Sequence, residues 1–269
     1  MKQKITKGAL ILVGVAFLIV MLVLPLATVL IYALRQGWAA FFSAVTDVYA
    51  VKALQLTLLT TAITVIVNTV FGIFAAWTIS KFRFRGKQAL TTLIDIPFSI
   101  SPVIAGLVFI LVFGRIGWAN PLLEALDLKI VFAVPGIVLA TIFVTFPFVS
   151  RELIPMMQAQ GSDEEEAAAL MGAGGFTIFR RITFPHIKWA LLYGVILCTA
   201  RSLGEFGAVS VVSGHLRGKT NTLPLHVEIL FNEFHLTAAF AVSSILVLIA
   251  VVILILRNIV EYRVKREER

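Results

Sequence analysis

The amino-acid sequence predicts an all-α, polytopic membrane protein with six transmembrane helices in one domain covering residues 1–269. Of its 269 residues, 59% are hydrophobic and only 14% are charged, and the mean hydropathy is +0.97. A soluble domain carries about a quarter charged residues. Here the charges gather in short clusters between long apolar runs, which is typical of a chain that crosses a membrane repeatedly.

The apolar runs have the length that a membrane requires, because a hydrocarbon core about 30 Å thick needs roughly 20 apolar residues in a helix. Each span must be helical, since backbone groups find no water partners in lipid. The first run is too long for a signal peptide and lacks a small-residue cleavage site, so we expect an uncleaved helix. The predicted spans are 8–34, 53–80, 88–114, 130–150, 189–213 and 237–256.

Two prolines interrupt the third predicted span. Pro97 and Pro102 each lack a backbone N–H, and a proline inside a helix also clashes with the preceding turn. We therefore expect this span to kink or break between them. Such breaks occur where neighbouring helices or a polar pathway cover the freed carbonyl groups.

The distribution of basic residues predicts the orientation. Sixteen of the 23 Lys and Arg residues fall on the side of the N-terminus, six fall in the opposite loops, and Arg201 lies within a span. Lys and Arg collect on the cytoplasmic side, so both termini should be cytoplasmic. The net charge of +8 then reflects the membrane rather than nucleic acid, and we expect lipid, not nucleic acid, as a partner.

The sequence offers little for catalysis or metal binding. The single Cys198 can form neither an intrachain disulfide nor a zinc site. The four histidines show no ligand spacing on one predicted helix, and no constellation of His, Asp and Glu suits a membrane enzyme. A phosphate-loop lookalike at 214–220 has three residues between its glycines where the motif needs four. We therefore expect no catalytic residue and no metal site.

The longest loop on the cytoplasmic side, 151–188, reads as two short helices. Ser162 is a suitable N-cap, and Glu165 three residues later predicts a capping box. The acidic first turn suits the positive end of the helix dipole. Gly172 suits the left-handed position past the helix end. A second helix should begin at Phe176 and end near Pro185, so the simplest interpretation is an amphipathic pair lying on the membrane.

The loop also carries a spaced motif: Glu166-Ala167-Ala168, then Gly172, then Ile182, Phe184 and Pro185. It resembles the EAA loop of the permeases of ABC importers of type I, with Phe184 where leucine is usual. The resemblance implies a coupling helix that docks in a cleft of a separate cytoplasmic ATPase. It also implies that this chain binds no cofactor, since ATP and magnesium would sit on the partner. A channel or secondary transporter working alone would leave the motif unexplained.

Three further stretches resemble the W-type permease subunits of sulfate/thiosulfate importers, namely 95–102, 145–153 and 200–209. The first and last also resemble molybdate permeases and the T-type sulfate subunit, so these alternatives stay open. The resemblance implies a bacterial inner-membrane location. The implied partners are two ATPase copies, a T-type permease completing a heterodimer and an extracytoplasmic sulfate-binding protein.

Arg201 and Glu205 are the candidate pathway residues within the fifth predicted span. They lie four residues apart and thus on one helix face. Each charge costs about 2.5–3.5 kcal/mol at the bilayer centre, which implies a position facing protein or water. Either Arg201 attracts an oxyanion while Glu205 limits its binding, or the two form a structural ion pair. Ser99 and Ser101, between the two prolines, either offer hydroxyls to the anion or bond to backbone.

Overall fold

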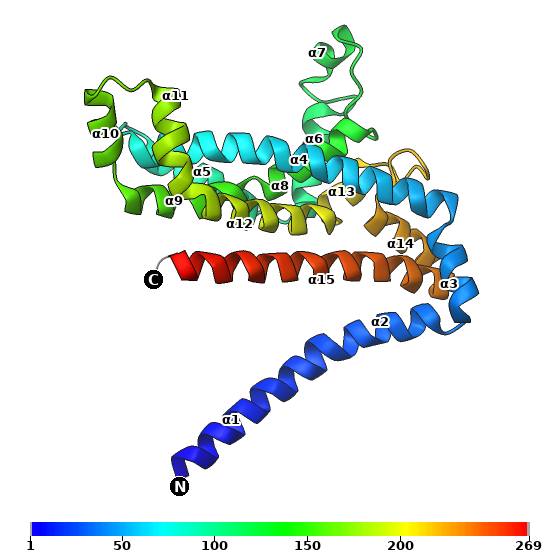
Figure 1. Cartoon of the computed structure of the whole chain (residues 1–269). Coiled ribbons are helices and arrows are strands. Elements are labelled where there is room, and N and C mark those ends of the chain that lie inside the picture. Colours follow the sequence, from blue (N-terminus) through cyan, green and yellow to red (C-terminus); the bar gives the residue numbers. More distant parts are fainter. Residues whose placement is uncertain (1, 268–269) are drawn as a thin grey trace.

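The computed structural model describes residues 2–267, and it contains no strand in that part of the chain (Figure 1). The all-α fold class is therefore confirmed. The elements in chain order, with two π-helical turns labelled η, are α1 Lys2–Leu18, η1 Ile19–Val23, α2 Leu24–Leu34, α3 Gly37–Val45, α4 Val48–Lys81, α5 Lys87–Ser99, α6 Pro102–Phe113, α7 Asn120–Ala125, α8 Val134–Thr145, α9 Pro147–Gln160, α10 Asp163–Leu170, α11 Gly175–Ile178, η2 Phe179–Thr183, α12 Phe184–Leu203, α13 Gly207–Val212, α14 Leu223–Asn232 and α15 Leu236–Glu267.

Five helical segments of the described chain are long and apolar enough to cross a membrane, and a bent pair makes up to six. The five are Leu10–Leu34, Val48–Lys81, Val134–Gln160, Gly175–Leu203 and Leu236–Tyr262. The start of α1, the end of α15 and the α10–α11 hairpin lie at one end of the bundle, with α3 and α14 at the other (Figure 1). We call these the α10 end and the α14 end.

The bent pair is α5 and α6, which meet at 108°. Pro97 lies inside α5, while Pro102 lies in the first turn of α6. The N–H groups of a first turn have no partner within the helix, so a proline there costs no hydrogen bond. Ser101 before it is extended, with φ −58° and ψ 133°, as the ring of the following proline demands. The break predicted between the two prolines is thus where the chain turns.

The expected boundaries of the fourth and fifth spans differ from the observed helices. The α8–α9 segment runs on to Gln160 instead of ending near residue 150. Pro185 does not end the second loop helix, because it lies in the first turn of α12 and the chain is helical from Gly175 to Leu203. The 189–213 span is in turn interrupted after Leu203, and α13 starts only at Gly207.

Three helices pack closely together in the bundle: α4, α9 and α12. A Cβ at Gly72 of α4 would lie 2.8 Å from the Cβ of Val149 in α9, and one at Gly194 of α12 would lie 3.1 Å from the Cα of Val149. Small residues let helix backbones approach closely in lipid. Val149 is fully buried between them and joins Leu153 and other buried side chains in one apolar cluster.

The N-terminal helix stands apart from this core. The apolar window of Leu10–Leu34 buries none of its residues inside the chain's own fold, and α1 diverges from α15 in Figure 1. Only its far part is anchored, where Tyr32 of α2 packs on Phe240 of α15 with ring centroids 5.3 Å apart. A long apolar surface therefore faces lipid or another apolar partner.

Candidate functional site

The candidate coupling loop is the helical hairpin between α9 and α12. Its first helix, α10, begins after Ser162 and carries four acids in its first turn, as the dipole argument predicts. The predicted capping box is not formed. Ser162 Oγ instead donates to Glu166 Oε1 at 2.6 Å, and Glu165 turns inward to Lys81 and Thr183. Glu165 is thus a contact between elements and not a local cap.

The end of α10 is set by Gly172, which has φ +84°. The Gly172 N–H donates to Ala169 O at 2.9 Å, and the Ala173 N–H donates to Ala168 O at 3.0 Å. This pair of bonds is the Schellman motif, and its central position requires the left-handed conformation that glycine adopts at no steric cost. The left-handed position predicted for Gly172 past the helix end is confirmed.

The other motif residues divide between two places. Glu166 and Ala167 lie on the exposed side of α10, while Ala168 is buried. Ile182 is half-buried in η2, and Pro185 is exposed at the start of α12. Glu166, Ala167 and Ala168 thus belong to the coupling-loop helix α10. Ile182 and Pro185 belong to the segment that leads from the hairpin back into the membrane bundle.

The sequence reasoning missed an apolar tip on this hairpin. Leu170 is 90% exposed, Met171 83% and Phe176 76%. Apolar side chains clustered at such exposure mark an interaction surface more often than a free one. The signal was present in the sequence, because two large apolar residues directly precede Gly172 at the end of an otherwise acidic and alanine-rich helix.

The candidate anion pathway lies where two helix breaks meet. A Cβ at Gly207, the start of α13, would lie 2.9 Å from the Cβ of Pro102, the start of α6. A Cβ at Gly106 would lie 2.7 Å from the carbonyl oxygen of Ala208. The first turns of α6 and α13 are therefore packed directly against each other.

The arrangement of Arg201 and Glu205 differs from the single helix face that the spacing predicts. Glu205 lies beyond the end of α12, where its Oε1 accepts from the Ala208 N–H at 2.8 Å and so begins α13. Its Oε2 lies 2.6 Å from Arg201 Nη1. The Glu205 side chain is 1% exposed and that of Arg201 is 32% exposed. Glu205 therefore binds both the start of α13 and the Arg201 guanidinium, while part of the arginine side chain stays accessible.

Ser99 and Ser101 flank the other break, and both are exposed. Ser101 is the N-cap residue of α6, yet its side chain makes no capping hydrogen bond. Its hydroxyl therefore does not serve the backbone at that helix start. The structure brings both breaks together, but no hydrogen bond within the described residues joins either serine to Arg201.

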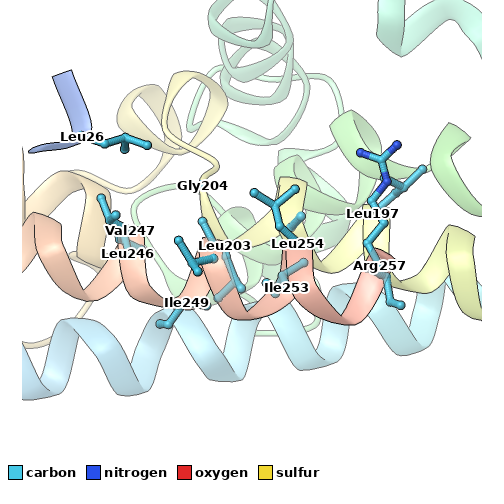
Figure 2. A pocket seen from close by; sticks show the side chains of 14 residues that line it. Leu26, Leu197, Leu203, Gly204, Leu246, Val247, Ile249, Ile253, Leu254 and Arg257 are labelled. Carbon is cyan, nitrogen blue, oxygen red and sulfur yellow. The ribbon is translucent and has the colours of Figure 1, made fainter. Parts of the chain in front are cut away.

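A separate apolar groove of about 520 Å³ runs between α12 and α15. In Figure 2 aliphatic side chains such as Leu203 and Leu254 line it, and Arg257 stands at one end. Arg257 Nε donates to the hydroxyl of Tyr193 at 3.1 Å. A wall of this composition offers no donors to an anion along most of its length, so we do not count it as part of the pathway.

Comparison with known proteins places these features in a family. Residues 68–266 match the family described as binding-protein-dependent transport system inner membrane component. The chain is 48% identical to the sulfate transport system permease protein CysW of Synechococcus elongatus, covering 96% of this chain and 91% of that one. It is 45% identical to CysW of Escherichia coli strain K12, with 99% and 92% covered.

A more distant relative and a solved structure agree with this placement. The sulfate transport system permease protein CysT of Salmonella typhimurium is 34% identical, with 93% of this chain and 90% of that one covered. A chain of the bacterial alginate ABC transporter, solved with an alginate pentasaccharide-bound periplasmic protein, matches with a TM-score of 0.80 at 18% identity, covering 98% and 96%. That likeness shows the fold. The chain is a multi-pass membrane protein that belongs to the family of binding-protein-dependent transport system inner membrane components.

Proposed function

We propose that this chain is the W-type permease subunit of an ATP-driven importer that moves sulfate and thiosulfate across the bacterial inner membrane. The observation that carries the proposal is the identity of 45–48% to CysW relatives over nearly the whole chain. The T-type relatives reach 33–34%, so the T-type alternative is disfavoured. Molybdate import stays an alternative for the uptake assay to decide.

Energy in this proposal comes from a separate ATPase, present in two copies, which binds ATP and magnesium. This chain contributes the α10–α11 hairpin. Its apolar tip of Leu170, Met171 and Phe176 would enter an apolar cleft of the ATPase, and the Gly172 turn fixes the angle at which the tip is presented. Movement of the two ATPase copies then moves the hairpin, and with it the spans.

The proposed orientation puts this hairpin and both termini in the cytoplasm. The excess of Lys and Arg on that side supports it. The second permease would be a T-type chain, and the apolar surface of 10–34, which this chain leaves uncovered, is available to lipid or to that subunit. An extracytoplasmic sulfate-binding protein would deliver the anion at the α14 end.

Within the membrane, we propose that the oxyanion passes the junction of the two helix breaks. The accessible part of the Arg201 guanidinium attracts it, and Glu205 keeps that guanidinium in place while limiting its pull. Helix α6 begins beside the start of α13, so the positive end of its dipole lies at this junction. The exposed hydroxyls of Ser99 and Ser101 can donate further hydrogen bonds.

The test is uptake by vesicles that hold the complete complex. ATP-dependent accumulation of labelled sulfate, competed by thiosulfate and not by molybdate, is the expected result. Uptake by the chain without any ATPase would instead identify a channel or secondary transporter. Preferential uptake of molybdate over sulfate would assign the chain to the alternative substrate.

A further inference from the structure

We propose that Lys81, Glu165 and Thr183 form a buried latch that joins α10 to the ends of α4 and α12, so that the three helices move together during transport. The inference rests on the proposed role of α10 in coupling to an ATPase. It adds three positioning residues that lie outside the spaced motif of the loop.

The latch is built from three elements that are far apart in the sequence. Lys81 is the last residue of α4, and its Nζ lies 3.0 Å from Glu165 Oε1 in the first turn of α10. The same Oε1 accepts from Thr183 Oγ1 at 2.6 Å, directly before α12. Lys81 Nζ also donates to the carbonyl of Gly161, at the end of α9. One carboxylate and one ammonium thus tie together the ends of four helices.

Burial separates this ion pair from the others in the loop. The side chains of Lys81 and Glu165 are 6% and 13% exposed, and Thr183 is fully buried. By contrast, the nearby pair of Glu164 and His186 has side chains 60% and 44% exposed, where water and salt screen it. Removing one member of a buried pair leaves the other charge without compensation, so such a pair resists separation.

Further contacts near the latch also hold the end of α4 against the hairpin. The ring of Trp77 in α4 stacks on Phe179 of η2, with centroids 5.2 Å apart and planes 25° apart. Ser80 Oγ donates to the carbonyl oxygen of Ile154 in α9 at 3.3 Å. The end of α4 therefore contacts both arms of the helical hairpin: the arm that follows α9 and the arm that leads into α12.

Helix α4 can carry a displacement from this end to the other side of the bundle. It is an unbroken helix of 34 residues, capped at its start by the Asp47 carboxylate. Midway, Asn68 Nδ2 donates to Thr145 Oγ1 of α8 at 2.8 Å. Near the α14 end, Thr57 Oγ1 accepts from the Leu223 N–H at the start of α14, at 2.7 Å. A force on α10 thus reaches α8 and α14 through buried polar contacts along one helix.

The first experiment measures sulfate uptake and ATP hydrolysis on the same proteoliposomes of the complete complex. Lys81→Met and Glu165→Gln remove the latch, and the exposed neighbours Arg85→Gln and Asp163→Asn are the matched controls. We expect the latch variants to retain the ATPase subunits and hydrolysis within about twofold, while sulfate moved per ATP falls about tenfold. The exchanged pair K81E/E165K should recover part of the ratio, because the attraction is restored.

An unchanged ratio in the latch variants would overturn the latch. Failure of the wild-type chain to hold any ATPase would overturn the proposed function instead, so the two failures are distinct. If the latch variants do not assemble, cross-linking decides. In a C198A background, K81C/E165C lacks the ion pair, so joining the two cysteines with a short bifunctional thiol-reactive cross-linker should restore assembly and uptake, because the two positions are again held together. An assembled, cross-linked complex without uptake would show that the two positions must separate.

Discussion

Gly72 of α4 and Val149 of α9 approach so closely that a Cβ on the glycine would lie 2.8 Å from the valine Cβ. Val149 is fully buried and also lies close to Gly194 of α12, so an added methyl group at Gly72 would overpack this contact. Gly72→Ala should therefore destabilise the bundle by about 1–3 kcal/mol, as overpacking of a tight core does. Thermal unfolding of the chain in detergent would measure it.

The matched control is Gly14→Ala in α1, where a Cβ meets nothing within 4 Å. Alanine has the higher helix propensity, so this change should leave the unfolding temperature equal or slightly raised. Equal unfolding temperatures for the two variants would contradict the close approach of α4 and α9.

Gly172→Val should impair coupling, because the residue would have to hold φ +84° at the end of α10. That conformation costs a residue with a Cβ about 1–2 kcal/mol, and more for a β-branched one. Co-purification of the ATPase and ATP-dependent sulfate uptake are the measurements, and both should fall. Gly174→Val is the control, since Gly174 has φ −72° and open space around it. Normal uptake in both variants would remove the argument for this turn.

The exposed tip should be an ATPase contact and contribute little to the fold. The double change L170S/M171S removes apolar side chains that are 90% and 83% exposed, so the free energy of unfolding should change by less than about 0.5 kcal/mol. The ATPase should nonetheless dissociate from the detergent-purified complex. Leu126→Ser and Leu128→Ser, exposed at 57% and 56% in another loop, are controls that should leave the complex intact. Retention of the ATPase by the tip variant would refute this docking surface.

The sequence was sufficient for the parts of the fold that depend on composition and local chemistry. Long apolar runs require helices in lipid, and the prolines at 97 and 102 place a break where the structure shows one. The left-handed turn at Gly172 likewise follows from a local rule that needs no tertiary contact. These features are predictable because each depends on a few neighbouring residues.

Two side-chain arrangements differ from what residue spacing predicts. Glu165 fits a capping box by spacing, but it binds Lys81, whose location beside α10 is set only by the packing of α4. Glu205 reads as a helical neighbour of Arg201, but its carboxylate captures the Ala208 N–H and starts a new helix. In both cases the carboxylate binds a buried polar group instead of making the contact that the residue spacing predicts. Spacing alone does not reveal such partners.

The substitutions Arg201→Gln and Glu205→Gln should distinguish a role in the anion pathway from a purely structural role. Arg201→Gln should reduce sulfate uptake at least about tenfold with normal assembly, since an accessible guanidinium is lost from the junction of the breaks. Glu205→Gln should destabilise the protein by about 1–3 kcal/mol, less than a fully buried pair would give, because Arg201 is 32% exposed. Uptake, co-purification and thermal unfolding are compared on each variant. Normal uptake by an assembled Arg201→Gln complex would assign the pair a structural role only.

The stability of the α14 end should depend on pH through His226. This side chain is 2% exposed, with Asn221 Nδ2 3.5 Å from its Nδ1. Burial lowers the pKa of His226 below its ordinary 6.5, and the positive charge of Arg217 acts in the same direction against the weaker opposing effects of Asp47 and Glu233. The folded state therefore keeps the imidazole neutral at pH values where the unfolded chain already binds a proton.

It follows that stability is fully present above pH 6.5 and is lost as the pH falls below it, toward the lowered folded-state pKa. Glu233 also favours its charged form in the folded state, because Arg217 hydrogen-bonds to it and lowers its pKa, but that contribution fades only near or below its ordinary 4.5. Unfolding temperatures between pH 7.5 and 5 therefore report on His226 with little contribution from Glu233. His226→Asn should flatten the decline, whereas His235→Asn, at an exposed neighbour, should leave it. The same slope in both variants would mean that His226 does not control the acid sensitivity of this end.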